Sequence, residues 1–160
     1  MMMRPTSAWD LVARLDATHV FTRVQYNPQD SKEKRDGQQD QLRQLASMCR
    51  HGDRKLIVEL VPKPTQWQID RHGDEATARA FVLHDSMRQL QDGGVEPHGW
   101  AVEPPKNSKA AAVLAAQAHV DDRTDTAVLF IVGNEPDPSR DRGAGHVANI
   151  APYLDPLDPG

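Results

Sequence analysis

Short apolar runs alternate along the chain with longer stretches in which apolar residues recur at every third or fourth position. Apolar runs of about four to eight residues bounded by turn-forming residues are typical of strands covered on both faces. Such runs predict strands over 20–26, 55–61, 100–103 and 126–132. The run at 100–103 is the weakest, and its assignment depends mostly on its place in the series.

The stretches between these strands have the period of an amphipathic helix. Their apolar stripes consist of Leu42, Leu45, Met48 and Cys49, then Ala80, Leu83, Met87 and Leu90, then Ala111, Leu114, Ala115 and Ala118. Gly52 follows the first stripe and Gly93-Gly94 follows the second. Glycine there is a usual stop signal, because it adopts a left-handed conformation at little cost. Asn107 or Ser108 can cap the third helix.

The predicted elements alternate as strand, helix, strand, helix, strand, helix and strand, with roughly 30–40 residues in each unit. This alternation implies βαβ crossovers and a parallel sheet. We therefore predict an α/β domain of parallel βαβ units over 18–133. Residues 1–17 are expected to form a mobile N-terminal segment. The Pro-, Gly- and Asp-rich tail over 134–160 is expected to be loosely ordered, because it has no periodic apolar face.

Composition narrows the class of protein. The chain has 160 residues, of which 38% are hydrophobic, and this is enough for one domain of ordinary size. Its 19 basic and 23 acidic residues give a net charge of −4. Nonspecific binding of DNA or RNA needs a basic face, so we expect no nucleic-acid partner. A small anionic ligand needs only a local site and is still compatible with this charge.

The apolar runs also argue against a membrane protein. The longest, 56–58 and 127–132, are far shorter than the ~20 residues that cross a bilayer. No apolar segment follows the first residues, so we expect no signal peptide. The single cysteine, Cys49, cannot form an internal disulfide or a cysteine zinc cluster, and we interpret it as an inert core thiol. A reducing, cytoplasmic setting is expected.

Candidate catalytic residues lie where the predicted strands end, because parallel α/β folds concentrate their chemistry at the carboxyl ends of strands. Glu59 interrupts the apolar run 56–61, and a carboxylate in such a strand is costly without a partner. It is a general acid/base or ligand-orienting group, or else a structural ion-pair member or a side chain at an open sheet edge. Glu103 ends the third strand and is a second candidate, or else a solvated residue at a strand end.

Candidate ligand-binding residues lie at the same strand ends. Tyr26 and Asn27 end the first strand. Lys63 and Lys106 each follow a later strand and can hold a phosphate as point charges, unless they are simply exposed to solvent. Gly133-Asn134 can present backbone N–H groups to an anion, or it can form a turn.

The sequence contains none of the common cofactor or metal motifs. It has no GxSxG, Walker or GxGxxG pattern, and its seven histidines show no His-x-His or His-Glu-x-x-His spacing. We therefore expect neither a metal site nor a cofactor.

Three segments, in this order, resemble a known family of enzymes. They read VQYNP at 24–28, RKLIVELVP at 54–62 and LQDGGVEPHGWAVE at 90–103. The series resembles the aldolase-like domain of inositol catabolism, which is often fused to a sugar kinase and is assigned to 2-deoxy-5-keto-gluconate 6-phosphate aldolase. That family looks related to the class I tagatose 1,6-bisphosphate aldolases, which are (β/α)8 barrels. The resemblance covers about residues 18–133 and is most specific over 89–103.

The resemblance implies a partial, half TIM-barrel-like fold, because a complete barrel needs ~200–250 residues. It also implies that Glu59 and Glu103 retain the family's acidic positions. The matching strand of the family reads Trp-Lys-apolar-Glu, and its lysine is the expected Schiff-base nucleophile. Here that position is Ala101, which has no amine. Phe21 stands where the family tends to carry a lysine early in the first strand.

Three hypotheses follow from this combination. The first is an aldolase-family carbon–carbon lyase for a phosphorylated keto sugar in carbohydrate or inositol catabolism, with impaired or no activity as a lone chain. The second is a noncatalytic sugar-phosphate-binding or assembly module, which Ala101 favours, and the third is a truncated remnant. An open parallel sheet leaves unpaired edges and an apolar face, so a homodimer or a partner chain is expected to cover it.

Overall fold

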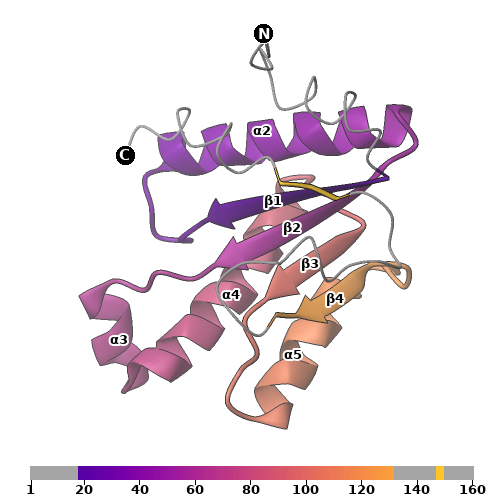
Figure 1. Cartoon of the computed structure of the whole chain (residues 1–160). Coiled ribbons are helices and arrows are strands. Elements are labelled where there is room, and N and C mark those ends of the chain that lie inside the picture. Colours follow the sequence, from indigo (N-terminus) through magenta and orange to yellow (C-terminus); the bar gives the residue numbers. More distant parts are fainter. Residues whose placement is uncertain (1–17, 132–146, 150–160) are drawn as a thin grey trace, which may run out of the picture.

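The computed structural model describes residues 18–131 and 147–149, and Figure 1 shows how their elements are arranged. The elements in chain order are β1 (His19–Gln25), α2 (Lys32–His51), β2 (Lys55–Val61), α3 (Gln66–His72), α4 (Glu75–Asp92), β3 (Gly99–Val102), α5 (Ser108–Ala118), β4 (Ala127–Phe130) and β5 (Val147–Asn149). The four predicted strands and three predicted helices are present, with boundaries that differ by a few residues.

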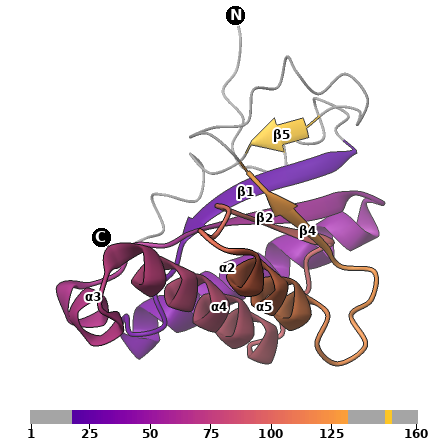
Figure 2. The ribbon, with the colours of Figure 1, turned by 90° about the horizontal axis from the view of Figure 1, so that it is seen from below.

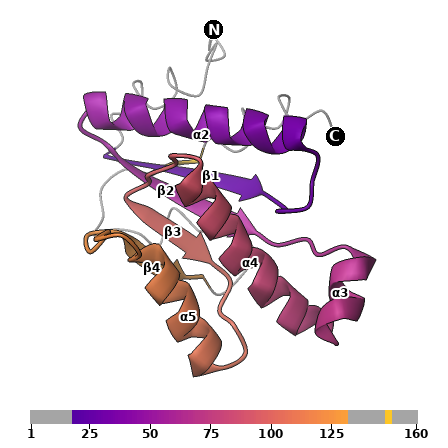
Figure 3. The same ribbon diagram turned by 180° about the vertical axis from the view of Figure 1, so that it is seen from behind.

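The strands form one sheet in the order β4-β3-β2-β1-β5, and every neighbouring pair is parallel. The prediction of an α/β fold with parallel βαβ units is confirmed. From β1 to β4 each strand is added on the same side of the previous one, and only β5 is added on the other side of β1. The order from β1 to β4 is how successive units follow one another in a (β/α)8 barrel. Helices α2, α4 and α5 accordingly cover the same face of the sheet (Figures 2 and 3).

The hydrophobic core lies between this face and the helices. Successive strand residues point to opposite faces, so only alternate positions reach the core. The strands contribute Val20, Val24, Leu56, Val58, Leu60, Trp100 and Val102, and the helices contribute Leu42, Leu45, Cys49, Leu83, Met87, Leu90 and Leu114. The interpretation of Cys49 as a buried thiol is confirmed, because it is 0% exposed and burial raises its pKa to about 11.

Side chains cap the starts of the helices. Asp74 accepts a hydrogen bond from the Thr77 N–H at the start of α4, at 2.7 Å. Of the two predicted caps of α5, Asn107 is the one observed, and its side chain accepts from the Ala110 N–H at 2.8 Å. These bonds satisfy N–H groups that have no partner within the helix.

The glycines predicted to end α2 and α4 do follow these helices, but only one of them has the predicted left-handed conformation. Gly52 and Gly93 follow α2 and α4 with φ of −87° and −79°, which any residue can adopt. Gly94 adopts the left-handed conformation, with φ of +84°. After α4 it is therefore the second glycine of the predicted pair that adopts this conformation.

Two elements were not predicted. Helix α3 is short and begins with a capping box, in which Thr65 and Gln68 each hydrogen-bond the other's backbone N–H. Strand β5 lies within the segment 134–160 and extends the sheet beyond β1. The remainder of that segment and the predicted mobile segment 1–17 lie outside the described residues.

Candidate functional site

The candidate site lies on the sheet face opposite the helices. No described helix covers this face (Figure 2). Arg23 of β1 is paired in register with Glu59 of β2, and Glu59 is paired with Ala101 of β3. Side chains in register on neighbouring parallel strands point to the same face. We call these three residues the Arg23–Glu59–Ala101 row.

Glu59 is held in an ion pair within this row. It is 8% exposed, and the Arg23 Nε–H donates to Glu59 Oε2 at 2.6 Å. The guanidinium offsets the cost of removing the carboxylate from water. Glu59 is therefore a member of an ion pair, one of the roles that its place in an apolar strand predicts.

Ala101 is the β3 member of the row, is paired in turn with Leu129 of β4, and is 0% exposed. Its side chain is a methyl group, so the row has an arginine and a carboxylate but no amine nucleophile. The neighbouring row on this face consists of Phe21, Ile57, Gly99 and Ala127. It also lacks a lysine, so neither row can form an imine with a carbonyl compound.

The second candidate carboxylate, Glu103, is bound by an arginine from α4. Arg79 Nε–H donates to Glu103 Oε2 at 2.9 Å, and Arg79 Nη2–H donates to Oε1 at 2.5 Å. This two-pronged geometry fits guanidinium to carboxylate and raises the pKa of Arg79. Glu103 therefore ties the carboxyl end of β3 to α4.

Tyr26 lies on the helix side of the sheet. It is 1% exposed, donates from its hydroxyl to Gln89 Oε1 at 2.9 Å, and accepts from Gln39 Nε2 at 3.1 Å. Burial is the main cause of its raised pKa. Its position therefore separates it from the Arg23–Glu59–Ala101 row.

Asn27 forms a closed pair with Gln68 at the start of α3. The two side-chain amides exchange hydrogen bonds of 2.8 and 3.0 Å, and Asn27 Nδ2 also donates to the Lys63 carbonyl at 3.1 Å. Two chain segments that follow neighbouring strands are joined in this way. Asn27 thus organises the carboxyl end of the sheet through its amide.

The two candidate lysines, Lys63 and Lys106, are both exposed after the ends of β2 and β3. Lys106 lies near the start of α4. There the pKa of Asp74 is lowered mainly by the hydrogen bond from Thr77, with a contribution from the Lys106 charge. Gly133-Asn134, the remaining candidate, lies outside the described residues.

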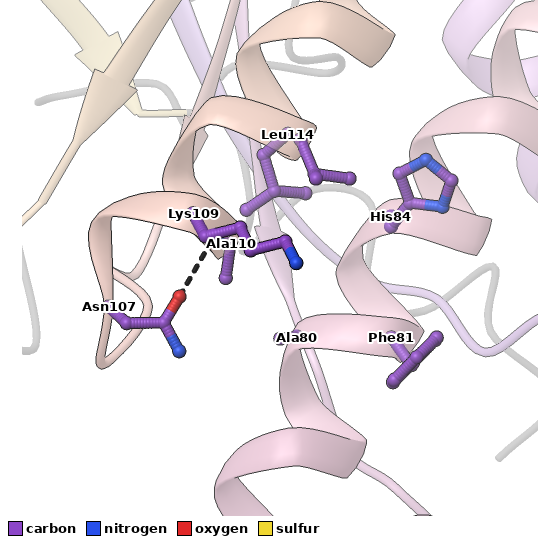
Figure 4. A pocket seen from close by; sticks show the side chains of 8 residues that line it. Ala80, Phe81, His84, Asn107, Lys109, Ala110 and Leu114 are labelled. Carbon is purple, nitrogen blue, oxygen red and sulfur yellow. Dashed lines mark hydrogen bonds between the residues drawn. The ribbon is translucent and has the colours of Figure 1, made fainter.

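A groove of about 340 Å³ lies between α4 and α5, away from the sheet face (Figure 4). Phe81 and His84 line it from α4, and Lys109, Ala110 and Leu114 line it from α5. Its surface is almost entirely apolar, so it offers packing and few directional contacts. Across residues 18–131 and 147–149, no three potential ligands of the His, Cys, Asp and Glu types gather to hold a metal ion.

Sequence reasoning identified the carboxylates but missed their partners, Arg23 and Arg79. The signal for Arg23 was available, because a charged residue in an apolar strand needs a neighbour as much as Glu59 does. The register that brings the two together cannot be read from either strand alone. A cavity lined by His19, Lys55 and His98 at the amino ends of the strands was not predicted either, because parallel α/β folds place their sites at the carboxyl ends.

No helix in the described part of the chain is both long and apolar enough to span a bilayer.

Comparison with known proteins provides a family but no activity. A search of curated proteins found no match. A family model described as an uncharacterized protein conserved in bacteria (DUF2090) matches residues 11–140 and so spans most of the chain, including β1 to β4 and the helices between them. The chain therefore belongs to this bacterial family.

Proposed function

We propose that this chain is an aldolase-related domain that binds a small phosphorylated keto sugar without cleaving it. The observation that carries the proposal is the Arg23–Glu59–Ala101 row. The position expected to hold the nucleophile is a buried methyl group, and the neighbouring carboxylate is paired with an arginine at 2.6 Å. An aldolase of the lysine type needs an amine for its covalent intermediate.

The second expected carboxylate adds to this argument. Glu103 receives two hydrogen bonds from Arg79, which hold its carboxylate against α4. A general acid must reach the substrate to give it a proton, and both oxygens of this carboxylate already accept hydrogen bonds from a guanidinium. The acidic positions of the resembling family thus have structural partners here.

The exposed lysines support the choice of ligand. Lys63 and Lys106 follow two neighbouring strands at the carboxyl edge of the sheet, where parallel α/β folds bind their ligands. An ammonium group holds phosphate as a point charge. The resemblance suggests a keto sugar phosphate of carbohydrate or inositol catabolism as the molecule that carries this phosphate.

Borohydride trapping with dihydroxyacetone phosphate tests the absence of cleavage chemistry. The folded wild-type chain should give no adduct in intact mass measurements, because no lysine occupies the row. The variant Ala101→Lys places an amine beside Glu59 and should become trappable. Ala101→Met is its matched control, since it has similar length and no amine. Circular dichroism establishes that each protein is folded.

Binding is measured with the same ligand by calorimetry on the wild type and on the variant Lys63→Gln/Lys106→Gln. We expect wild-type binding that the double variant weakens about tenfold or more, because two phosphate contacts are lost. An adduct on the wild-type chain would overturn the noncatalytic role. Absence of binding, with or without an adduct, would overturn the role in sugar-phosphate recognition.

A second candidate function, assembly with a second copy of this chain, is favoured by strand β4. This strand is at the edge of the described sheet, and its Leu129 and Phe130 are 46% and 42% exposed. Because β5 already pairs with the outer edge of β1, two copies cannot close a barrel by joining β4 to the partner's β1. A two-fold axis would instead pair β4 with its own copy, antiparallel.

Light scattering across a range of concentrations tests this assembly. Leu129→Lys should favour the monomer, because a charge on an edge strand discourages pairing. Val120→Lys is the matched control, since Val120 is 40% exposed but lies outside the strands. A wild-type chain that stays monomeric, or equal effects of the two variants, would contradict assembly through β4.

A further inference from the structure

A cavity of about 320 Å³, lined mostly by charged residues and histidines, lies at the amino ends of the strands, the edge of the sheet opposite to Lys63 and Lys106. His19 and Lys55 line it from the starts of β1 and β2, and His98 lines it from the residue before β3. Arg50 and Arg54 line it from the end of α2 and the loop after it. Basic groups from four parts of the fold therefore converge on one cavity.

The charge of this cavity has the opposite sign to that of the chain. Arg50, Arg54 and Lys55 contribute three positive charges, and Asp53 is the acidic residue among its lining residues, whereas the whole chain has a net charge of −4. Clustered like charges repel one another, and an anion among them removes that repulsion. The composition of the whole chain conceals this local site.

His98 is held in a defined orientation at the cavity. Its Nδ1 accepts a hydrogen bond from the Leu56 N–H at 3.1 Å, and its backbone N–H donates to the Leu56 carbonyl at 2.9 Å. Because Nδ1 accepts, the neutral ring carries its proton on Nε2, which is the donor that remains. Burial lowers the pKa of His98, as do the charges of Lys55, Arg50 and His19.

Arg50 is tethered by a neutral group. Its Nη2–H donates to the Glu96 carbonyl at 3.2 Å, which fixes the side chain without cancelling its charge. Lys55 is exposed at the first position of β2. An oriented guanidinium, an exposed ammonium and a fixed imidazole together provide the donors that a phosphate group needs.

We propose that this cavity binds the phosphate group of a small phosphorylated molecule, with Arg50, Lys55 and His98 as its binding residues. The site is independent of the proposed sugar-phosphate site, because the two lie at opposite ends of the strands. Its phosphate belongs to a regulator or to a second ligand. Occupancy would join α2 to the starts of β1, β2 and β3, and would therefore stabilise the fold.

Calorimetric titration with inorganic phosphate, at an ionic strength matched with sodium chloride, tests the site. We expect Arg50→Gln and Lys55→Gln each to weaken phosphate binding about tenfold or more. Arg88→Gln is the matched control, because it removes an equal charge from an exposed position on α4. Lys63→Gln/Lys106→Gln should leave this binding unchanged, which separates the result from the proposed function.

A nuclear magnetic resonance titration of the imidazole signals provides the second readout. Phosphate should raise the pKa of His98, because an anion favours the protonated ring. The His98→Gln variant identifies the signal by its loss. Wild-type phosphate binding no stronger than chloride binding, an unmoved His98 pKa, or an equal loss in Arg88→Gln would each overturn the proposal.

Discussion

Arg23 of β1 and Glu59 of β2 form an ion pair on the sheet face. Each charge offsets the cost of removing the other from water. Arg23→Gln leaves the Glu59 carboxylate without this cation at a position that is 8% exposed. We expect a loss of about 1–3 kcal/mol in the free energy of unfolding. This loss is smaller than the loss expected from breaking a fully buried ion pair, because the Arg23 side chain is 34% exposed. Chemical denaturation measures the loss.

The double variant Arg23→Met/Glu59→Met is the control for this prediction. Replacing both partners with apolar side chains removes the Arg23–Glu59 pair without leaving one member of it alone, and such replacements are often close to neutral. The double variant should therefore unfold at a denaturant concentration nearer to that of the wild type than Arg23→Gln does. A double variant less stable than Arg23→Gln would show that the ion pair is not the source of the loss.

Cys49 should be chemically silent in the folded protein. Its thiol is 0% exposed, and desolvation by burial raises its pKa to about 11, so little thiolate forms in mildly alkaline solution. A thiol reagent should label the folded chain only as fast as the chain unfolds, and should label one cysteine per chain in urea. Rapid labelling without urea would contradict the described packing of α2.

The sequence indicated which single residues are unusual for their position in an element, but not which residues they contact. Glu59 is conspicuous because a carboxylate interrupts an apolar run, and the pair with Arg23 depends on a register set by the whole sheet. Tyr26 and Asn27 follow a strand as ligand-binding residues often do, yet both contribute hydrogen bonds to packing. The residue after a strand can point to either face, and sequence alone cannot choose between them.

Helix α2 contains a glycine that offers a direct test of the helix. Gly37 lies within α2, and a Cβ built there meets nothing within 4 Å. Gly37→Ala should stabilise the protein by about 0.5–1 kcal/mol, because alanine loses less backbone entropy in a helix. Gly94→Ala is the contrasting control, since φ of +84° strains any side chain and should cost about 1–2 kcal/mol. Thermal unfolding distinguishes the two, and equal effects would contradict both assignments.

Long elements with a strong period were predictable, and short ones were not. Helices α2, α4 and α5 carry apolar stripes over 11 or more residues, enough to show a period. Helix α3 has 7 residues, and its best signal was the Thr65–Gln68 capping box. Strand β5 has 3 residues and is defined by pairing with the distant β1, which leaves no local pattern to find.

For the molecule as a whole, the lowered pKa of His98 links stability to pH. Burial and the charges of Lys55, Arg50 and His19 lower it from the ordinary value of 6.5, so the unfolded chain binds this proton at higher pH than the folded chain. Stability from this residue is therefore complete above about pH 6.5 and falls as the pH is lowered below it. His98→Gln should reduce the change of the free energy of unfolding with pH in that range, measured by chemical denaturation in phosphate-free buffer. An unchanged slope would contradict the linkage.

Stability should also be uneven across the sheet. Strand β2 has neighbours on both sides and is mostly buried, whereas β4 is at the described edge and three of its four residues are exposed. Amide hydrogens in β4 should therefore exchange faster than those in β2 in dilute protein, because edge strands open locally at lower cost. Hydrogen exchange measured by mass spectrometry compares peptides covering 127–130 and 55–61. Equal protection in the dilute monomer would contradict this order. Protection of β4 that rises with protein concentration, while that of β2 does not, would instead identify this edge as the surface where two copies meet.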